Sequence, residues 1–214
     1  MLSSIQKSIE TTYGIRSPWA VEAFLIDESQ RGAFAEKIPW LKNSSEALLI
    51  SQDEEEVELG LLFDSKLLEW SEAHDWETLV SNTPLLSLPL QKIGALIEGV
   101  SHFVYLTWRA EQDRAVTQLE LELQAEVDKF VLLLGDTSVS ERHEFFHRLF
   151  SETPWRPDLN SAEKERYETA MKLATRYCHH LKSAYSLAQA DAWLPEVRSF
   201  YRKSQVEKIR HIHS

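Results

Sequence analysis

A chain of 214 residues is long enough to bury a substantial core, and its 43% hydrophobic and 27% charged content is typical of a globular rather than a disordered protein. Its net charge of −11 argues against a broad nucleic-acid-binding surface, because an acidic body repels phosphate backbones. No apolar run approaches the roughly 20 residues that span a bilayer, and we expect no secretory signal in the first residues.

The first 80 residues predict an acidic region that contains helices and one β-hairpin. Ser3–Tyr13 is expected to form a short helix that stops at Gly14, and Pro18 suits the first turn of a second helix. Apolar residues then alternate along residues 57–63, which is the period of a half-buried strand. With residues 47–51 before it, this strand predicts a β-hairpin, which must pack on neighbouring helices to be stable.

Beyond the hairpin the chain predicts helices only. The Pro-containing segment 81–91 is the expected connection between the acidic region 1–80 and a helical bundle 92–214, with one continuous domain as the alternative. Short connections make successive helices antiparallel neighbours, so the expected fold class is mostly α: an antiparallel helical bundle with an N-terminal helix plus β-hairpin region. The expected helices cover residues 67–76, 92–110, 117–134, a segment opened by a capping box at 138–141, residues 161–190, and a last segment that begins at Pro195.

The helix predicted at residues 92–110 carries charged groups where none are expected. It is apolar nearly all round, which indicates an interior position. Glu98 and His102 nevertheless stand four residues apart on one face, with Arg109 further along the same stripe. A carboxylate buried there must be paired, protonated or bound to a metal, because an isolated buried charge is too costly.

The next helix repeats this pattern. Glu126 falls inside its apolar stripe and Glu122 lies at the edge of that stripe, one turn earlier. Glu120 and Asp128 are expected on the solvated surface. Pairs of ligands at four-residue spacing, contributed by facing helices, are the way in which helical bundles build metal sites. The sequence therefore predicts a buried polar network of Glu98, His102, Glu122 and Glu126.

A third pair of titratable residues lies in the run His143-Glu144-Phe145-Phe146-His147. This run resembles the zincin motif, in which two helix histidines bind zinc and the glutamate activates water. The resemblance implies His143 and His147 as metal ligands and Glu144 as the catalytic residue of a zinc-dependent hydrolase. Two features depart from the family pattern: Glu141 and Arg148 occupy flanks that are usually uncharged, and no distinctive third ligand follows, the candidates being Glu163, Glu165 and Glu168.

Three interpretations of these pairs stay open. The first is a purely structural network, in which His143 and His147 face inward and are hydrogen-bonded by Glu98, Glu122 or Glu126; no cofactor is expected in that case. The second is a Glu/His metal site in the bundle core, holding zinc or iron. The third is the zinc hydrolase.

The favoured function is a binding or accessory protein without established catalysis. Its partner is expected to be another protein rather than a membrane, and a homo-oligomer is compatible with the sequence. The one cysteine, Cys178, fits a small residue in the apolar stripe of its helix, and a chain that cannot form an internal disulfide favours a reducing, cytoplasmic location.

Overall fold

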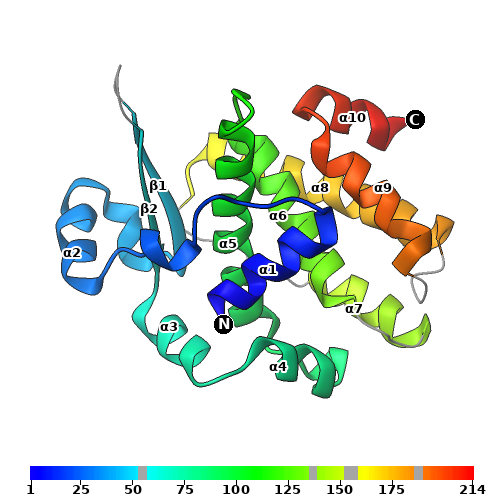
Figure 1. Cartoon of the computed structure of the whole chain (residues 1–214), viewed down its shortest axis with the longest axis horizontal. Helices are drawn as coiled ribbons and strands as arrows, with labels where there is room; N and C mark the ends of the chain where they lie inside the picture. Colours follow the sequence, from blue (N-terminus) through cyan, green and yellow to red (C-terminus); the bar gives the residue numbers. More distant parts are fainter. Residues whose placement is uncertain (53–56, 135–138, 152–158, 186–189) are drawn as a thin grey trace.

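The computed structural model describes residues 1–52, 57–134, 139–151, 159–185 and 190–214. Within them the chain forms ten α-helices and one two-stranded antiparallel sheet, which confirms the mostly-α prediction (Figure 1). The strands are β1 (Glu46–Gln52) and β2 (Val57–Phe63), and the helices are α1 (Leu2–Tyr13), α2 (Glu28–Lys37), α3 (Ser65–Glu72), α4 (Trp76–Asn82), α5 (Leu90–Ala110), α6 (Gln118–Leu133), α7 (Val139–Ser151), α8 (Ser161–Ala184), α9 (Ala190–Arg202) and α10 (Gln205–His213).

The N-terminal helix ends as predicted. Gly14 adopts a left-handed conformation (φ 58°, ψ 47°), which glycine reaches without a steric cost, and its amide donates back to the Thr11 carbonyl. The prediction of a helix from Pro18 is wrong. Residues 21–24 form a short 3₁₀ turn, and α2 begins only after Asp27, which caps it reciprocally with Gln30. Proline fixes one torsion angle, whereas the Asp27 cap satisfies free amides of the first turn.

The single helix predicted at residues 67–76 is also wrong, because this segment contributes to two helices. Asp64 caps α3, and Asp75 caps α4 by accepting a hydrogen bond from the Thr78 amide. A side-chain cap of this kind starts a new helix and stabilises it by about 1 kcal/mol. The second cap, placed where the first helix ends, therefore favours two short helices over one long one.

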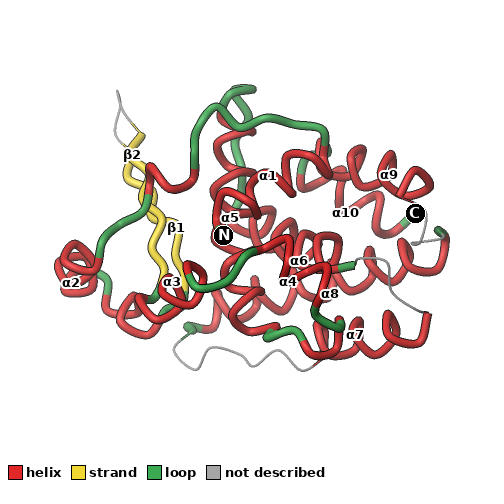
Figure 2. Tube along the Cα trace, turned by 60° about the horizontal axis from the view of Figure 1, so that its bottom comes forward, coloured by secondary structure: helices red, strands yellow, loops and turns green. Residues whose placement is uncertain are grey.

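The β-hairpin is confirmed, and its end at Glu46 and Phe63 is buried on both faces. β1 and β2 pair from Glu46 opposite Phe63 to Gln52 opposite Val57. Phe63 packs against α5 at Gly99, where an added Cβ would lie only 2.6 Å from the phenyl ring. On the opposite face Leu62 belongs to a second small core with Ala35, Leu41 and Ala47. The hairpin therefore lies between α5 and the α2 segment, as Figures 1 and 2 both show.

Helix α6 lies at the centre of the bundle. It packs against α5, α8 and α1, so side chains on almost every face of it are buried. The expectation that Glu120 and Asp128 lie on the surface is therefore wrong: Glu120 is 2% exposed and Asp128 is fully buried. A periodicity argument assumes that each helix has one solvated side, and α6 has none.

The C-terminal helices differ from the prediction in their boundaries. α8 ends at Ala184, and Pro195 lies inside α9 instead of starting it. Pro195 lies beyond the first turn of α9, so it removes one backbone hydrogen bond of the helix and its ring crowds the carbonyl of the preceding turn. α10 follows after a capping box of Ser204 and Glu207.

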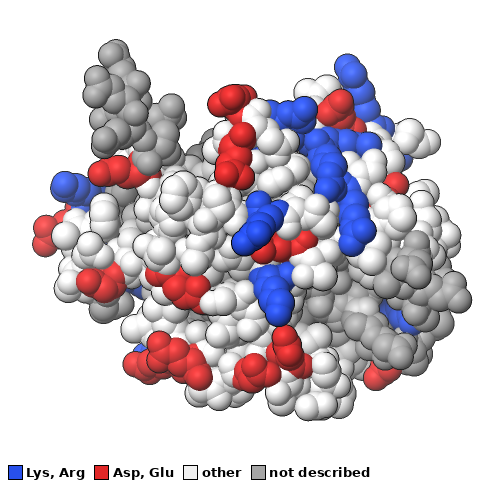
Figure 3. Space-filling view, viewed as in Figure 1, with Lys and Arg blue, Asp and Glu red and all other residues white. Residues whose placement is uncertain are grey.

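In Figure 3, Lys and Arg side chains gather around α9 and α10, whereas Asp and Glu lie along the edge formed by α3 and α4.

One hydrophobic core includes residues from both sides of the segment 81–91, and Leu85 and Leu88 of that segment are themselves buried in it. Tyr13 of α1, for example, stacks on Tyr201 of α9 with ring centroids 3.9 Å apart. Independent folding of residues 92–214 remains a prediction. The capping box expected at 138–141 includes Ser138, which lies outside the described residues.

Candidate metal centre

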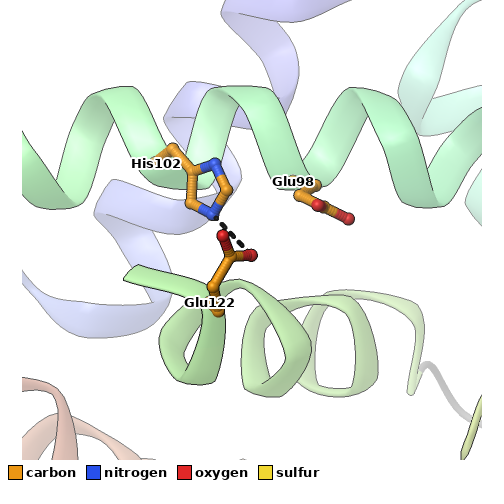
Figure 4. Close-up of side chains that lie close together, drawn as sticks. All are labelled: Glu98, His102 and Glu122. Atoms are coloured by element: carbon orange, nitrogen blue, oxygen red, sulfur yellow. Dashed lines mark ion pairs between the residues drawn. The ribbon is translucent and has the colours of Figure 1, made fainter. Parts of the chain in front are cut away.

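Two central helices bring Glu98, His102 and Glu122 together (Figure 4). Glu98 and His102 are one turn apart on α5, and Glu122 reaches toward them from α6. One ligand atom from each residue can be chosen so that all three atoms lie within 4.8 Å of one another. In the described part of the chain this is the one group of three or more His, Cys, Asp or Glu residues with such spacing.

The imidazole ring of His102 lies between two carboxylates. Its Nε2 atom is 3.6 Å from Oε2 of Glu122, and its Nδ1 atom is 3.9 Å from Oε2 of Glu46, the first residue of β1. The His102 side chain is 8% exposed, and Nε2 has no hydrogen-bond partner among the described residues. A buried ring nitrogen without a partner costs about 1–3 kcal/mol, so this atom requires an explanation.

Burial controls the charge of the ring and of the facing carboxyl. It lowers the pKa of His102 to about 4, and the nearby Lys129 ammonium acts in the same direction. The imidazole is therefore neutral at pH 7 and has a lone pair to offer to an ion. Burial, reinforced by the charge of Glu98, raises the pKa of Glu122 to about 8. A metal ion bound there would replace the proton of this carboxyl.

Lys129 forms the polar edge of the site. Its ammonium donates to Oε1 of Glu126 at 2.6 Å and to Oε2 of Glu98 at 3.1 Å. Burial alone would lower the pKa of Lys129, but the charges of Glu126 and Glu98 outweigh it and raise that pKa. Glu126 is buried, as expected. Its partner, however, is this lysine on its own helix and not the expected group from α5 or from His143 and His147.

The His143-Glu144-Phe145-Phe146-His147 run forms part of α7, but the expectation that its histidines face inward is wrong. His143, Glu144 and His147 are all exposed, whereas Phe145 is fully buried. Phe145 and Leu149, one turn later, bury more apolar surface than two imidazoles would, and they determine which side of α7 faces the core. Nδ1 of His143 lies 3.4 Å from the Lys182 ammonium.

Sequence reasoning missed a second buried polar cluster, centred on Asp128. This carboxylate accepts hydrogen bonds from Tyr13, from Ser101 at 2.5 Å and from Gln124 at 2.7 Å. The ammonium of Lys208, which is fully buried in α10, donates to Gln124 at 2.7 Å. The cluster thus ties α1, α5 and α10 to α6. Acidic residues lie on every side of α6, so nothing in its periodicity singled out Asp128 as internal.

A third buried group links α5, α6 and α10 nearer the α5–α6 turn. Arg109 donates to Glu120 at 2.8 Å, and Glu120 also accepts from the Tyr105 hydroxyl at 2.5 Å. The Tyr105 hydroxyl in turn accepts a hydrogen bond from Lys208 at 2.9 Å. Arg109 lay on the polar stripe predicted for α5, but its partner on α6 was predicted to be solvated.

Asp128 gives a testable pH dependence. Burial raises its pKa to about 6 from an ordinary 3.8, although hydrogen bonds from Ser101, Tyr13 and Gln124 oppose the shift. Between these pH values the folded protein keeps a proton that the unfolded chain releases, so the contribution of this group to stability falls as the pH rises from about 4 to about 6. The amide side chain of an Asp128→Asn variant does not titrate. We therefore expect urea unfolding to show that the wild type loses about 3 kcal/mol of unfolding free energy relative to the variant as the pH rises through this window. A difference that does not change with pH would contradict the assignment.

None of the compared family models, curated proteins or solved structures matches the chain. Among the described helices, none is long and apolar enough to cross a membrane.

Proposed function

We propose that this chain is an α-helical binding protein whose ligand is a divalent transition-metal ion, held by Glu98, His102 and Glu122. The observation that carries the proposal is the buried Nε2 atom of His102, which faces Glu122 and has no hydrogen-bond partner among the described residues. Coordination to an ion would satisfy this nitrogen and would place positive charge beside two carboxylates.

The ligand set favours zinc or ferrous iron. Imidazole is a preferred ligand of both ions, and carboxylate oxygens complete their sites in helical bundles. In a tetrahedral zinc site, ligand atoms about 2.0–2.2 Å from the ion lie about 3.3–3.6 Å from each other. The separation of 3.6 Å between His102 and Glu122 matches this spacing, and the whole group, whose ligand atoms lie within 4.8 Å of one another, must close by about 1 Å to bind zinc.

A purely structural network is the competing interpretation. In it the protonated carboxyl of Glu122 donates a hydrogen bond to Nε2 of His102. The distance of 3.6 Å between these atoms is longer than a hydrogen bond, which favours an ion as the missing component. The hydrolase interpretation has less support, because in the part of the chain that the structure describes no third ligand accompanies His143 and His147.

Metal analysis of the purified protein tests the proposal. The protein is prepared without a polyhistidine tag, its metal content is measured by mass spectrometry, and the chelated protein is titrated with zinc and, anaerobically, with ferrous iron. We expect one ion per chain in the wild type. His102→Gln and Glu122→Gln should lose it, because an amide of similar size replaces each ligand but binds these ions poorly.

A His143→Gln/His147→Gln double variant is the matched control, since it changes two exposed histidines on α7 and should keep the ion. The zinc hydrolase is correct instead if this control loses the metal, the wild type hydrolyses peptides, and the Glu144→Gln variant does not. Absence of metal from every form would leave the structural network. A protein partner, self-association and a cytoplasmic location remain predictions from the sequence.

A further inference from the structure

The β-hairpin contributes a residue beside the proposed metal site, in addition to those from the central helices α5 and α6. The Nδ1 atom of His102 points away from Glu122 and toward Glu46, which belongs to β1 and lies 3.9 Å away. Both side chains are buried, so water competes little for this nitrogen. The β-hairpin therefore contributes a carboxylate to the surroundings of a histidine on α5.

The backbone around Glu46 holds this carboxylate firmly. Glu46 pairs with Phe63 at the end of the sheet farthest from the connection between the strands, and the Arg31 guanidinium donates to the Phe63 carbonyl at 3.3 Å and to the Ser44 carbonyl at 3.0 Å. Ser44 in turn donates its hydroxyl hydrogen to the Glu46 carbonyl. These contacts fix the backbone from which the Glu46 side chain extends toward α5.

A glycine on α5 makes the approach possible. A Cβ added at Gly99 would lie 2.6 Å from the Phe63 ring and 3.4 Å from Oε2 of Glu46. A contact of 2.6 Å cannot be accommodated without moving the ring, so a larger residue at position 99 would push the end of the hairpin away from α5. Gly99 thus allows Glu46 to lie beside His102, three residues further along the helix.

We propose that Glu46 is a positioning residue for the metal site. At 3.9 Å its carboxylate is too far from Nδ1 for a hydrogen bond, but its negative charge favours the tautomer that carries the hydrogen on Nδ1 and directs the Nε2 lone pair toward Glu122 and Glu98. Histidines that bind metals commonly donate their other N–H to a carboxylate, which orients the ring and makes it a better ligand. Coordination at Nε2 also makes Nδ1–H a stronger donor, which draws the 3.9 Å contact together. The hairpin is then an integral part of the site and not only a cover for it. This inference rests on the proposed function for its metal, but the choice of tautomer does not.

The tautomer is measured directly by nitrogen-15 NMR of the histidine rings in the metal-free protein. We expect His102 to carry its hydrogen on Nδ1 in the wild type and in Glu46→Gln, whose amide oxygen still presents a partial negative charge to Nδ1. In Glu46→Ala the hydrogen should move to Nε2. Glu58→Gln is the matched control, because Glu58 is exposed on the paired strand β2, and it should leave the tautomer unchanged.

Metal titration of the same four proteins completes the test. Loss of a carboxylate that orients a metal-binding histidine weakens binding by about 10–100-fold. We expect this loss in Glu46→Ala, partial recovery in Glu46→Gln, and wild-type affinity in Glu58→Gln. A wild-type His102 with its hydrogen on Nε2, or a Glu46→Ala variant that binds zinc as tightly as the control, would overturn the role of Glu46. Wild-type protein that binds no metal but shows the Nδ1–H tautomer would instead refute the proposed function alone.

Discussion

Replacing Lys129 with leucine is expected to destabilise the fold by about 3–5 kcal/mol at pH 7, because it leaves the Glu126 carboxylate buried without its cation. Lys129 is also bound to Glu98, so its removal affects two carboxylates at once. The measurement is urea unfolding of the chelated protein followed by circular dichroism, with the midpoint and slope compared with the wild type.

Glu126→Leu is the matched control for this variant. It removes one carboxylate, but Lys129 keeps its 3.1 Å contact with Glu98, so no buried charge loses its last partner. It also removes the Oε2 atom of Glu126, which has no hydrogen-bond partner among the described residues. We therefore expect a change within about 1 kcal/mol. If Lys129→Leu and Glu126→Leu lower the unfolding free energy equally, the prediction that removing the lysine costs more than removing the carboxylate is wrong.

Arg109→Met is expected to cost a similar amount, about 3–5 kcal/mol, for the same physical reason. Arg109 is 1% exposed and pairs with the buried Glu120, which would keep only the hydrogen bond from Tyr105. The arginine also donates to the carbonyls of Arg202 and Lys203, so its loss removes a link between α5 and the α9–α10 turn.

The control for Arg109→Met is Arg114→Met, which changes an exposed arginine shortly after α5 and should alter the unfolding free energy by less than about 0.5 kcal/mol. Hydrogen exchange of α10 amides gives a second readout, since these amides should exchange faster in Arg109→Met than in the control. Unfolding midpoints that agree between the two variants would mean that the Arg109–Glu120 pair contributes no net stability.

Much of the architecture followed from local patterns in the chain. Alternation in residues 57–63 predicted a strand, and the all-apolar character of residues 92–110 predicted a buried helix; both are present. The errors arose where several weak signals compete. Pro18 suggested a helix start, but the Asp27 cap lies later in the chain and determines where α2 begins.

The candidate site was predictable only in part. Glu98, His102 and Glu122 could be identified because polar side chains at four-residue spacing interrupt apolar stripes. Glu46 could not, because nothing in a strand sequence shows which helix residue its carboxylate will meet. His143 and His147 were expected to face inward because they share a helix face with Phe146 and Phe150, but the structure buries the face of Phe145 and Leu149 instead.

The most direct test of the metal site is anomalous X-ray diffraction from crystals of the full chain grown with zinc, with data collected at wavelengths on either side of the zinc absorption edge. The metal proposal predicts one strong anomalous peak between Nε2 of His102 and the carboxylates of Glu122 and Glu98, with Nδ1 of His102 directed at Glu46. A peak at His143 and His147, or none near His102 in crystals that contain zinc, would contradict it.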